Sequence, residues 1–144
     1  MSGLEKKQLI ISLVGIKETG FSLKPDLRES DADKINWLIG FRPLLQGDQI
    51  SVEVRSVAIV TETNMEVASC SILMTYKVEN LEQFASKESE MSVRVDDQLM
   101  LNMLNPAMGT LRGTMYVRFL GTPLERMPLP LISVADMVNN AKKR

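Results

Sequence analysis

Residues 96–138 read DDQLMLNMLNPAMGTLRGTMYVRFLGTPLERMPLPLISVADMV, and this stretch is the most informative part of the chain. Its apolar residues recur at intervals of three and four, the spacing of one face of an α-helix. Asp96 and Asp97 are suited to cap the N-terminus of that helix and to oppose its dipole. We therefore expect a long helix over about 97–120, with an apolar stripe of Met100, Met103, Leu104, Ala107, Met108, Leu111, Met115 and Phe119.

Prolines and glycines interrupt this pattern. Pro106 would cost about 3 kcal/mol inside a straight helix, so the helix is expected to start later or to kink there. Gly113 lies in the segment LRGT (111–114), which predicts a turn-like break. Beyond the helix, Ser133 with an acidic residue three positions later predicts the start of a short final helix over about 133–142. The segment between the two helices is expected to be extended because of Pro123, Pro128 and Pro130.

Upstream of the helix, four segments alternate in hydrophobicity with period two, which is typical of strands with one dry face and one wet face. They cover about 8–24, 34–45, 49–62 and 66–78. In the third segment the apolar parity slips between Val54 and Val57, which predicts a β-bulge near Arg55 or Ser56. The parities of the second and fourth segments are regular, with Ile35, Trp37, Ile39 and Phe41 in one and Ala68, Cys70, Ile72, Met74, Tyr76 and Val78 in the other.

The connections between these segments predict the topology. Short turns at 46–48 and 63–64 make the second, third and fourth strands an antiparallel meander. The charged crossing at 26–34 is too long for a tight hairpin, so the first strand need not lie beside the second. Residues 79–97 are expected to form a polar loop with a short helix. The predicted fold is one α+β domain over 1–144, in which one long C-terminal helix and a short final helix pack on one face of a four-stranded antiparallel sheet.

Composition excludes several functions. A formal charge of -1 and an aromatic fraction of 5% argue against nucleic-acid binding. The chain has no histidine, which removes Ser-His-Asp catalysis and histidine-ligated zinc. Its single cysteine, Cys70, cannot form an intramolecular disulfide or a thiolate metal cage. We expect no cofactor, no metal and no enzymatic activity. The longest apolar run, at 9–16, is about half a membrane span, and no signal peptide opens the chain, so a cytoplasmic protein without a membrane span is expected.

Methionines point instead to an adaptable apolar surface. The chain has ten, of which six lie at or after Met100. Flexible thioethers let a surface fit varied side chains. Residues near the break and the crossing are the candidates for binding a polypeptide, and aromatic or apolar residues of the first two strands would add subsites. The candidates are Met115, Phe119, Met127, Leu129, Leu131, Ile132, Phe21, Leu23, Trp37 and Ile39.

The buried part of the helical stripe has two interpretations. Apolar side chains at this spacing form either ordinary core or a subunit interface. If they form an interface, the contact between subunits is expected at Met100, Met103, Leu104, Met108 and Leu111.

The order of these features resembles the SecB-type export chaperones of bacteria. The resemblance lies in four strands followed by a long helix, the Arg112-Gly113-Thr114 tripeptide, the Leu129-Pro130 crossing and a final helix with Asp136. Trp37 stands where that family has an early second-strand tryptophan, and residues 16–25 resemble the end of its first strand. The resemblance covers about 9–138.

The resemblance implies a function. Such a protein would be a cytoplasmic, ATP-independent holding chaperone and a homo-oligomer, either a dimer or a dimer of dimers. It would bind unfolded polypeptide clients in apolar grooves and serve protein export. Docking to the translocase motor SecA is doubtful for this chain, because its sheet face is mixed in sign and the sequence stops at basic Lys143 and Arg144. A dedicated client, of the kind attached to toxin–antitoxin pairs, is an equal alternative.

Two other interpretations stay open at this stage. One is a non-catalytic interaction module of the same fold, whose helix is used wholly for self-association and leaves no open groove. The other is a small enzyme or acyl-group binder of the hot-dog kind. That class places its main helix early, whereas this chain has it after all four strands, and no histidine is present for catalysis.

Overall fold

The computed structural model describes residues 8–127 and 129–142; Pro128, Lys143 and Arg144 lie outside the described residues. Four long strands form one antiparallel sheet in the order β1-β4-β3-β2. The strands are β1 (Ile11–Leu23), β2 (Ile35–Gln46), β3 (Gln49–Val60) and β4 (Met65–Val78). The predicted meander of β2, β3 and β4 is confirmed, and β1 pairs with β4 rather than with β2.

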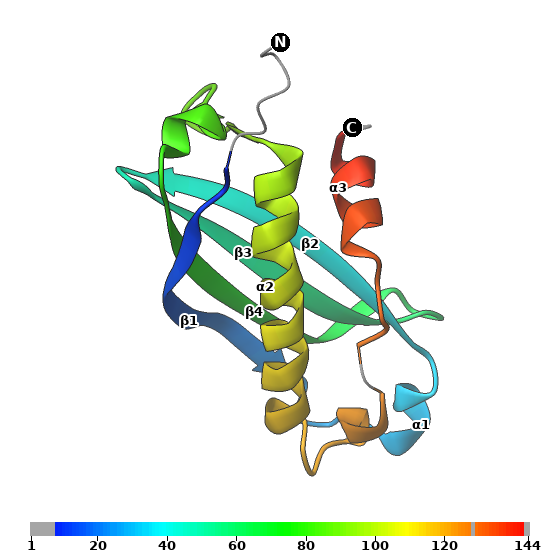
Figure 1. Cartoon of the computed structure of the whole chain (residues 1–144). Coiled ribbons are helices and arrows are strands. Elements are labelled where there is room, and N and C mark those ends of the chain that lie inside the picture. Colours follow the sequence, from blue (N-terminus) through cyan, green and yellow to red (C-terminus); the bar gives the residue numbers. More distant parts are fainter. Residues whose placement is uncertain (1–7, 128, 143–144) are drawn as a thin grey trace.

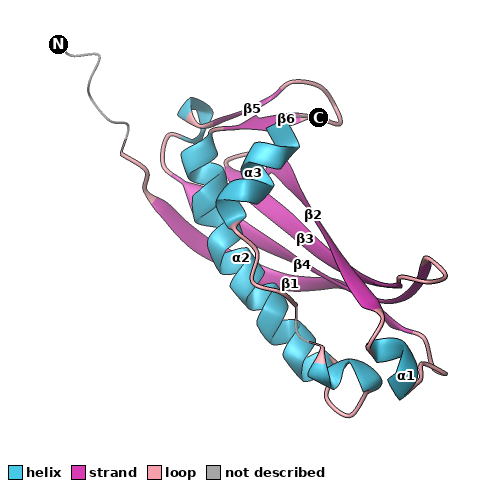
Figure 2. Cartoon of the chain, turned by 90° about the vertical axis from the view of Figure 1, so that its right-hand side faces the viewer, coloured by secondary structure: helices cyan, strands magenta, loops and turns pink. Residues whose placement is uncertain are grey.

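Two helices that come after β4 in the chain cover one face of the sheet (Figures 1 and 2). α2 (Asp97–Arg118) lies across the sheet, and α3 (Val134–Lys142) packs beside it. The predicted fold class is thereby confirmed. The Asp96 carboxylate accepts a hydrogen bond from the Gln98 amide at 2.9 Å, so the predicted N-cap is also confirmed. No helix of the described residues is both long enough and apolar enough to span a membrane.

α2 is less interrupted than its sequence predicts. It runs without a break from Asp97 to Arg118, through Pro106 and through Gly113. The predictions of a late start at Pro106 and of a break at residues 111–114 were therefore wrong, while the kink at Pro106 stays a prediction. Pro106 removes one backbone N–H from the helical ladder, and it lies on the exposed side of α2, away from the side chains that pack on the sheet.

The parity of β3 also differs from the prediction. No bulge occurs at Arg55 or Ser56; the register with β4 shifts later, between Ala58 and Ile59. Ser56 and Ala58 therefore face α2 and are fully buried, while Val57 is on the other face of the sheet and half-buried. The apolar character of Val57 was misleading, because small side chains occupy the inward positions here.

Shorter elements fill the connections. α1 (Glu29–Ala32) lies in the connection between β1 and β2, and η3 (Pro123–Arg126) is a short 3-10 helix near it. The segment after α2 is therefore helical at first rather than extended. Residues 79–96 hold the 3-10 helix η2 (Leu81–Gln83) and a small hairpin of β5 (Ala85–Lys87) and β6 (Val93–Val95), which the sequence did not predict.

The core lies between α2 and the sheet. β3 and β4 contribute alternate side chains, and α2 contributes its apolar stripe. The Tyr76 hydroxyl on β4 donates a hydrogen bond to the Met103 carbonyl at 2.9 Å, which ties the N-terminal half of α2 to the sheet. The largest fully buried side chains are Ile50, Ile72, Met74, Leu99, Met103, Leu104, Leu111 and Leu124.

Candidate functional site

Small side chains form the floor of the candidate site. Ser56 of β3 pairs with Cys70 of β4, and Ala58 pairs with Ala68, all on the face that carries α2. All four are fully buried. Their small volume leaves room above the central strands for larger side chains from the end of α2. The Ser56 hydroxyl donates a hydrogen bond to the Met115 sulfur at 3.1 Å, so Met115 lies directly on this floor.

Three aromatic rings meet at the end of α2. Phe119, the C-cap residue, has its ring centroid 5.7 Å from that of Phe21 and 6.1 Å from that of Trp37. These separations are typical of favourable aromatic pairs. Phe21 comes from β1 and Trp37 from β2, the two edges of the sheet, so Phe119 joins both edges. The Trp37 indole Nε1 is buried and has no acceptor among the described residues.

Arg118 closes this aromatic cluster on the β1 side. Its guanidinium carbon lies 5.1 Å from the centre of the Phe21 ring, and its Nη2 donates to the Glu18 carboxylate at 2.9 Å. The hydrogen bond that Arg118 donates to Glu18 raises the pKa of Arg118. Arg118 is exposed, so this pair orients Phe21 more than it stabilises the fold.

An apolar cavity of about 430 Å³ opens between the C-terminal half of α2 and the segment after it. We call it the α2 groove. Its volume falls in the range of binding pockets. Gly109 and Gly113 form part of its wall one helical turn apart, and a Cβ atom added at either would meet nothing within 4 Å. The groove is lined by Gly109, Arg112, Gly113, Met115, Tyr116, Phe119, Leu124, Glu125, Met127 and Leu129.

Arg112 has an unusual place in this wall. We call residues 127–133, which join η3 to α3, the crossing. Arg112 Nη2 donates a hydrogen bond to the Pro130 carbonyl of the crossing at 3.3 Å. Arg112 Nε is buried without an acceptor among the described residues. Most buried N–H groups have a partner, so this donor requires an explanation.

A second cavity, of about 500 Å³, lies at the other end of α2 between β2, β6 and α3. We call it the α3 cleft. Asp97 and Asn140 contribute polar side chains to its walls. It is lined by Ile39, Gly40, Phe41, Pro43, Val93, Val95, Asp97, Met100, Met137, Val138, Asn140 and Ala141.

The candidate polypeptide-binding residues fall into three groups. Met115, Phe119, Met127 and Leu129 line the α2 groove. Phe21 and Trp37 contact Phe119 without lining the groove, and Ile39 lines the α3 cleft. The remaining three lie apart from both cavities: Leu23 packs against the core, Ile132 is half-buried, and Leu131 is 89% exposed on the crossing.

The residues suggested for a subunit interface lie in the core of a single chain. Each is no more than 7% exposed, because this face of α2 packs against the sheet. An interface through α2 would therefore use its opposite face. The five residues are Met100, Met103, Leu104, Met108 and Leu111.

Sequence reasoning missed Arg112 as a lining residue, as well as Gly109, Gly113 and Tyr116. One signal was present in the sequence: between Asp97 and Arg118, Arg112 is the only charged residue. A surface helix normally carries charges on its solvent face. Among the described residues, no three or more Cys, Asp or Glu side chains gather to hold a metal ion.

Comparisons with known proteins found likenesses among solved structures. No family model matches the chain, and no curated protein matches its sequence. Eight chains of solved structures match its fold. One is the SecB-like chaperone Rv1957 of Mycobacterium tuberculosis, solved in complex with a ChAD peptide from the Rv1956 HigA1 antitoxin. That likeness has a TM-score of 0.44 and 11% sequence identity, and it covers 85% of this chain and 86% of that one. At these values it carries no argument about residues or activity.

Proposed function

We propose that this protein is a non-catalytic, ATP-independent holding chaperone that binds non-native polypeptides in the α2 groove. The observation that carries the proposal is the groove itself, with its apolar lining of Met115, Phe119 and Met127 and its glycine wall. Exposed apolar side chains occur in the groove wall and on the crossing. Tyr116 is 67% exposed and Leu131 is 89% exposed. Exposed apolar surface around a concavity is characteristic of an interaction site.

The energetics suit reversible capture. Burying one client Leu or Phe side chain contributes about 1.5 to 3 kcal/mol, and ordering the client offsets part of that gain. A few anchors are therefore enough for binding that can be released without ATP. Met115 and Met127 support low selectivity, because a thioether adapts to side chains of different shape.

We further propose a homo-oligomer, either a dimer or a tetramer. β1 is an edge strand, and three of its apolar side chains, Leu13, Val14 and Ile16, are each at least 50% exposed. A long edge strand with exposed apolar side chains tends to pair with another chain. Association through β1 would cover this surface and leave the α2 groove open.

A second candidate is the interaction module that has no client groove. It is favoured by the outer face of α2, where Arg112 is the only charge between Asp97 and Arg118. If two copies packed through this face, Gly109, Gly113 and Tyr116 would be covered. Met127 distinguishes the two candidates, because mild peroxide would oxidise it in an open groove and spare it in a closed one.

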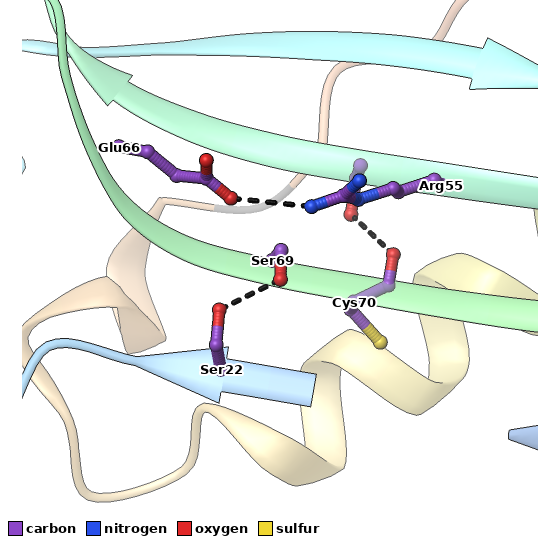
Figure 3. A network of polar contacts seen from close by, with 6 residues as sticks. Ser22, Arg55, Glu66, Ser69 and Cys70 are labelled. Atoms are coloured by element: carbon purple, nitrogen blue, oxygen red, sulfur yellow. Dashed lines mark hydrogen bonds and ion pairs between the residues drawn. The ribbon is translucent and has the colours of Figure 1, made fainter. Parts of the chain in front are cut away.

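We propose that the protein is cytoplasmic and that it either assists protein export or binds a dedicated client. The uncovered face of the sheet does not favour docking to SecA. Its charges are mixed in sign and some are paired, as in the ion pairs Arg42–Glu53 at 3.2 Å and Arg55–Glu66 at 3.3 Å. Figure 3 shows the second of these together with the hydroxyl pair Ser22–Ser69, 2.7 Å apart. A face satisfied in this way presents no strong field to a charged partner.

Suppression of aggregation tests the proposal. Purified protein at a stoichiometric amount, without nucleotide, is expected to keep a chemically unfolded model client from scattering light. Gly113→Leu would place a side chain in the groove and is expected to weaken this protection several-fold. Asn105→Leu adds the same side chain to α2 outside the groove lining and is the matched control. No protection by the wild type, or equal protection by both variants, would refute the groove as the client site.

A further inference from the structure

We propose that Arg112 is a specificity-determining residue of the α2 groove, and that it binds a carboxylate within an otherwise apolar polypeptide segment. This inference rests on the proposed function and adds a chemical preference to it. Three observations about the Arg112 guanidinium support it. Its charge has no ion-pair partner among the described residues, its Nε–H has no acceptor there, and its Nη2 donates a long hydrogen bond to the crossing.

The charge of Arg112 is isolated in the groove. The side chain is partly buried among Met115, Phe119 and Leu129, and it forms no ion pair within the described part of the chain. Glu125 also lines the groove but is exposed and makes no such pair with Arg112. A guanidinium in apolar surroundings favours a ligand that brings a negative charge.

The free donors have the geometry that a carboxylate needs. Nε–H and Nη2–H lie on one edge of the guanidinium plane, and this edge matches the two oxygens of a carboxylate. Nε has no acceptor, and Nη2 has only the Pro130 carbonyl at 3.3 Å. That length exceeds the roughly 2.7–2.9 Å of a charge-assisted hydrogen bond. A carboxylate would therefore use this edge better than the carbonyl does.

The contact with Pro130 links recognition to the crossing. Arg112 Nε is buried, so a carboxylate reaches it only when the atoms around it move. The single hydrogen bond from Nη2 to the Pro130 carbonyl fastens the crossing to α2 at this point. A client carboxylate that takes this edge competes with that bond. The crossing would then move away from α2, and its exposed Leu131 would move with it.

Peptide pairs test the inference on the full chain by fluorescence anisotropy. The probes share one apolar sequence and differ only at a central Glu or Gln, or at a free or amidated C-terminus. We expect the Glu peptide to bind wild type roughly tenfold tighter than the Gln peptide, the scale of a hydrogen bond to a charged group. A gain from the free terminus alone would assign the preference to a chain end. A gain from the internal Glu would assign it to a side chain.

Variants separate Arg112 from general charge effects. Arg112→Gln is expected to bring the Glu-to-Gln affinity ratio close to one. Arg112→Lys is expected to leave a smaller preference, because an ammonium lacks the planar fork. Arg126→Gln removes an exposed positive charge from nearby η3, outside the groove lining, and is expected to keep the wild-type ratio. The Glu-to-Gln affinity ratio of the wild type is measured without any variant, so it tests the inference even if a variant fails to fold.

The outcomes are distinguishable. If the wild type binds all peptides with equal affinity, the carboxylate preference is refuted while the holding function stands. If the ratio survives Arg112→Gln, Arg112 is not the determinant. If the wild type binds none of the peptides and protects no unfolded client, the proposed function fails and the inference fails with it.

Discussion

The hydroxyl of Ser56 donates a hydrogen bond to the sulfur of Met115, 3.1 Å away, across a contact between β3 and α2 that joins residues 59 apart in sequence. Met115 is both part of the core and part of the lining of the α2 groove. The groove is therefore built directly on the packing of helix against sheet, and substitutions beneath it should change stability and binding together.

Enlarging Ser56 should loosen this contact. The side chain is fully buried, so Ser56→Val overpacks the floor, and we expect the free energy of unfolding to fall by about 1 to 3 kcal/mol. Ser56→Ala should cost only about 1 kcal/mol, because it removes a hydrogen bond without adding volume. Urea denaturation followed by circular dichroism measures both. Equal stability of Ser56→Val and wild type would contradict the close packing described here.

The groove glycines should be replaceable with a gain in stability. Gly109 and Gly113 lie inside α2, where Ala is favoured by about 1 kcal/mol per residue, and a Cβ atom has free space at both. Gly109→Ala and Gly113→Ala are each expected to raise the free energy of unfolding by up to about that amount. Gly121→Ala is the contrasting control: its φ is +79°, so it should destabilise. A loss of stability on Gly113→Ala would mean that the wall of the groove is already occupied.

Alkaline pH should destabilise the fold through two buried groups. Burial raises the pKa of the Cys70 thiol to about 11, and the Glu18 carboxylate adds to this rise; burial also raises the pKa of Tyr76 to about 12. Both groups bind protons more tightly when folded than when unfolded, where the pKa values are roughly 8.5 and 10. Their stabilising contribution is complete below about pH 8.5 and is lost as pH rises toward 11 and 12.

Urea midpoints measured at pH 8 and pH 10.5 test this, and Cys70→Ala should show a smaller decrease between the two. A wild-type midpoint that rises over this interval would have the wrong sign. The same burial predicts that the Cys70 thiol of the folded chain reacts slowly with a thiol reagent at pH 8 and rapidly in denaturant.

The fluorescence of Trp37 should respond to changes at Phe119, which lines the α2 groove. Phe119→Ala is expected to lower the free energy of unfolding by about 3 to 5 kcal/mol and to shift the emission of Trp37, the sole tryptophan, to longer wavelength. Phe119→Leu fills more of the space and should cost less. Client binding to wild type should also change the Trp37 emission, since Phe119 lines the groove. An emission spectrum unaffected by Phe119→Ala would contradict the contact between the two rings.

The sequence predicted the fold well where pattern and burial agree. The alternation of β2 and β4 and the stripe of α2 are periodic over many residues, and a period is a local property that the chain alone carries. Pro106 was misleading, because the cost of a proline is real but smaller than the packing of a 22-residue helix against a sheet. Ser56 and Ala58 led to the wrong position for the bulge in β3, because their small side chains did not indicate that they face inward. Small inward residues are recognised only once the helix above them is known.

The candidate site was predictable in composition rather than in detail. Methionines and the proline-rich segment predicted a site near the end of α2, and Met115, Phe119, Met127 and Leu129 line one groove there. Leu131 and Ile132 were chosen by nearness in sequence, but an extended segment sends successive side chains to different sides. The isolated charge of Arg112 between Asp97 and Arg118 was visible in the sequence, but its unsatisfied Nε depends on burial that only the folded chain creates.

Site-specific photo-cross-linking shows whether an unfolded client binds at the α2 groove. Benzoylphenylalanine is introduced in place of Tyr116, which lines the α2 groove, or in place of Leu38, which is exposed on the uncovered face of the sheet. An unfolded client should cross-link strongly from position 116 and weakly from position 38, and Gly113→Leu should reduce the first yield. Equal yields from the two positions, or cross-links from position 38 alone, would contradict the account.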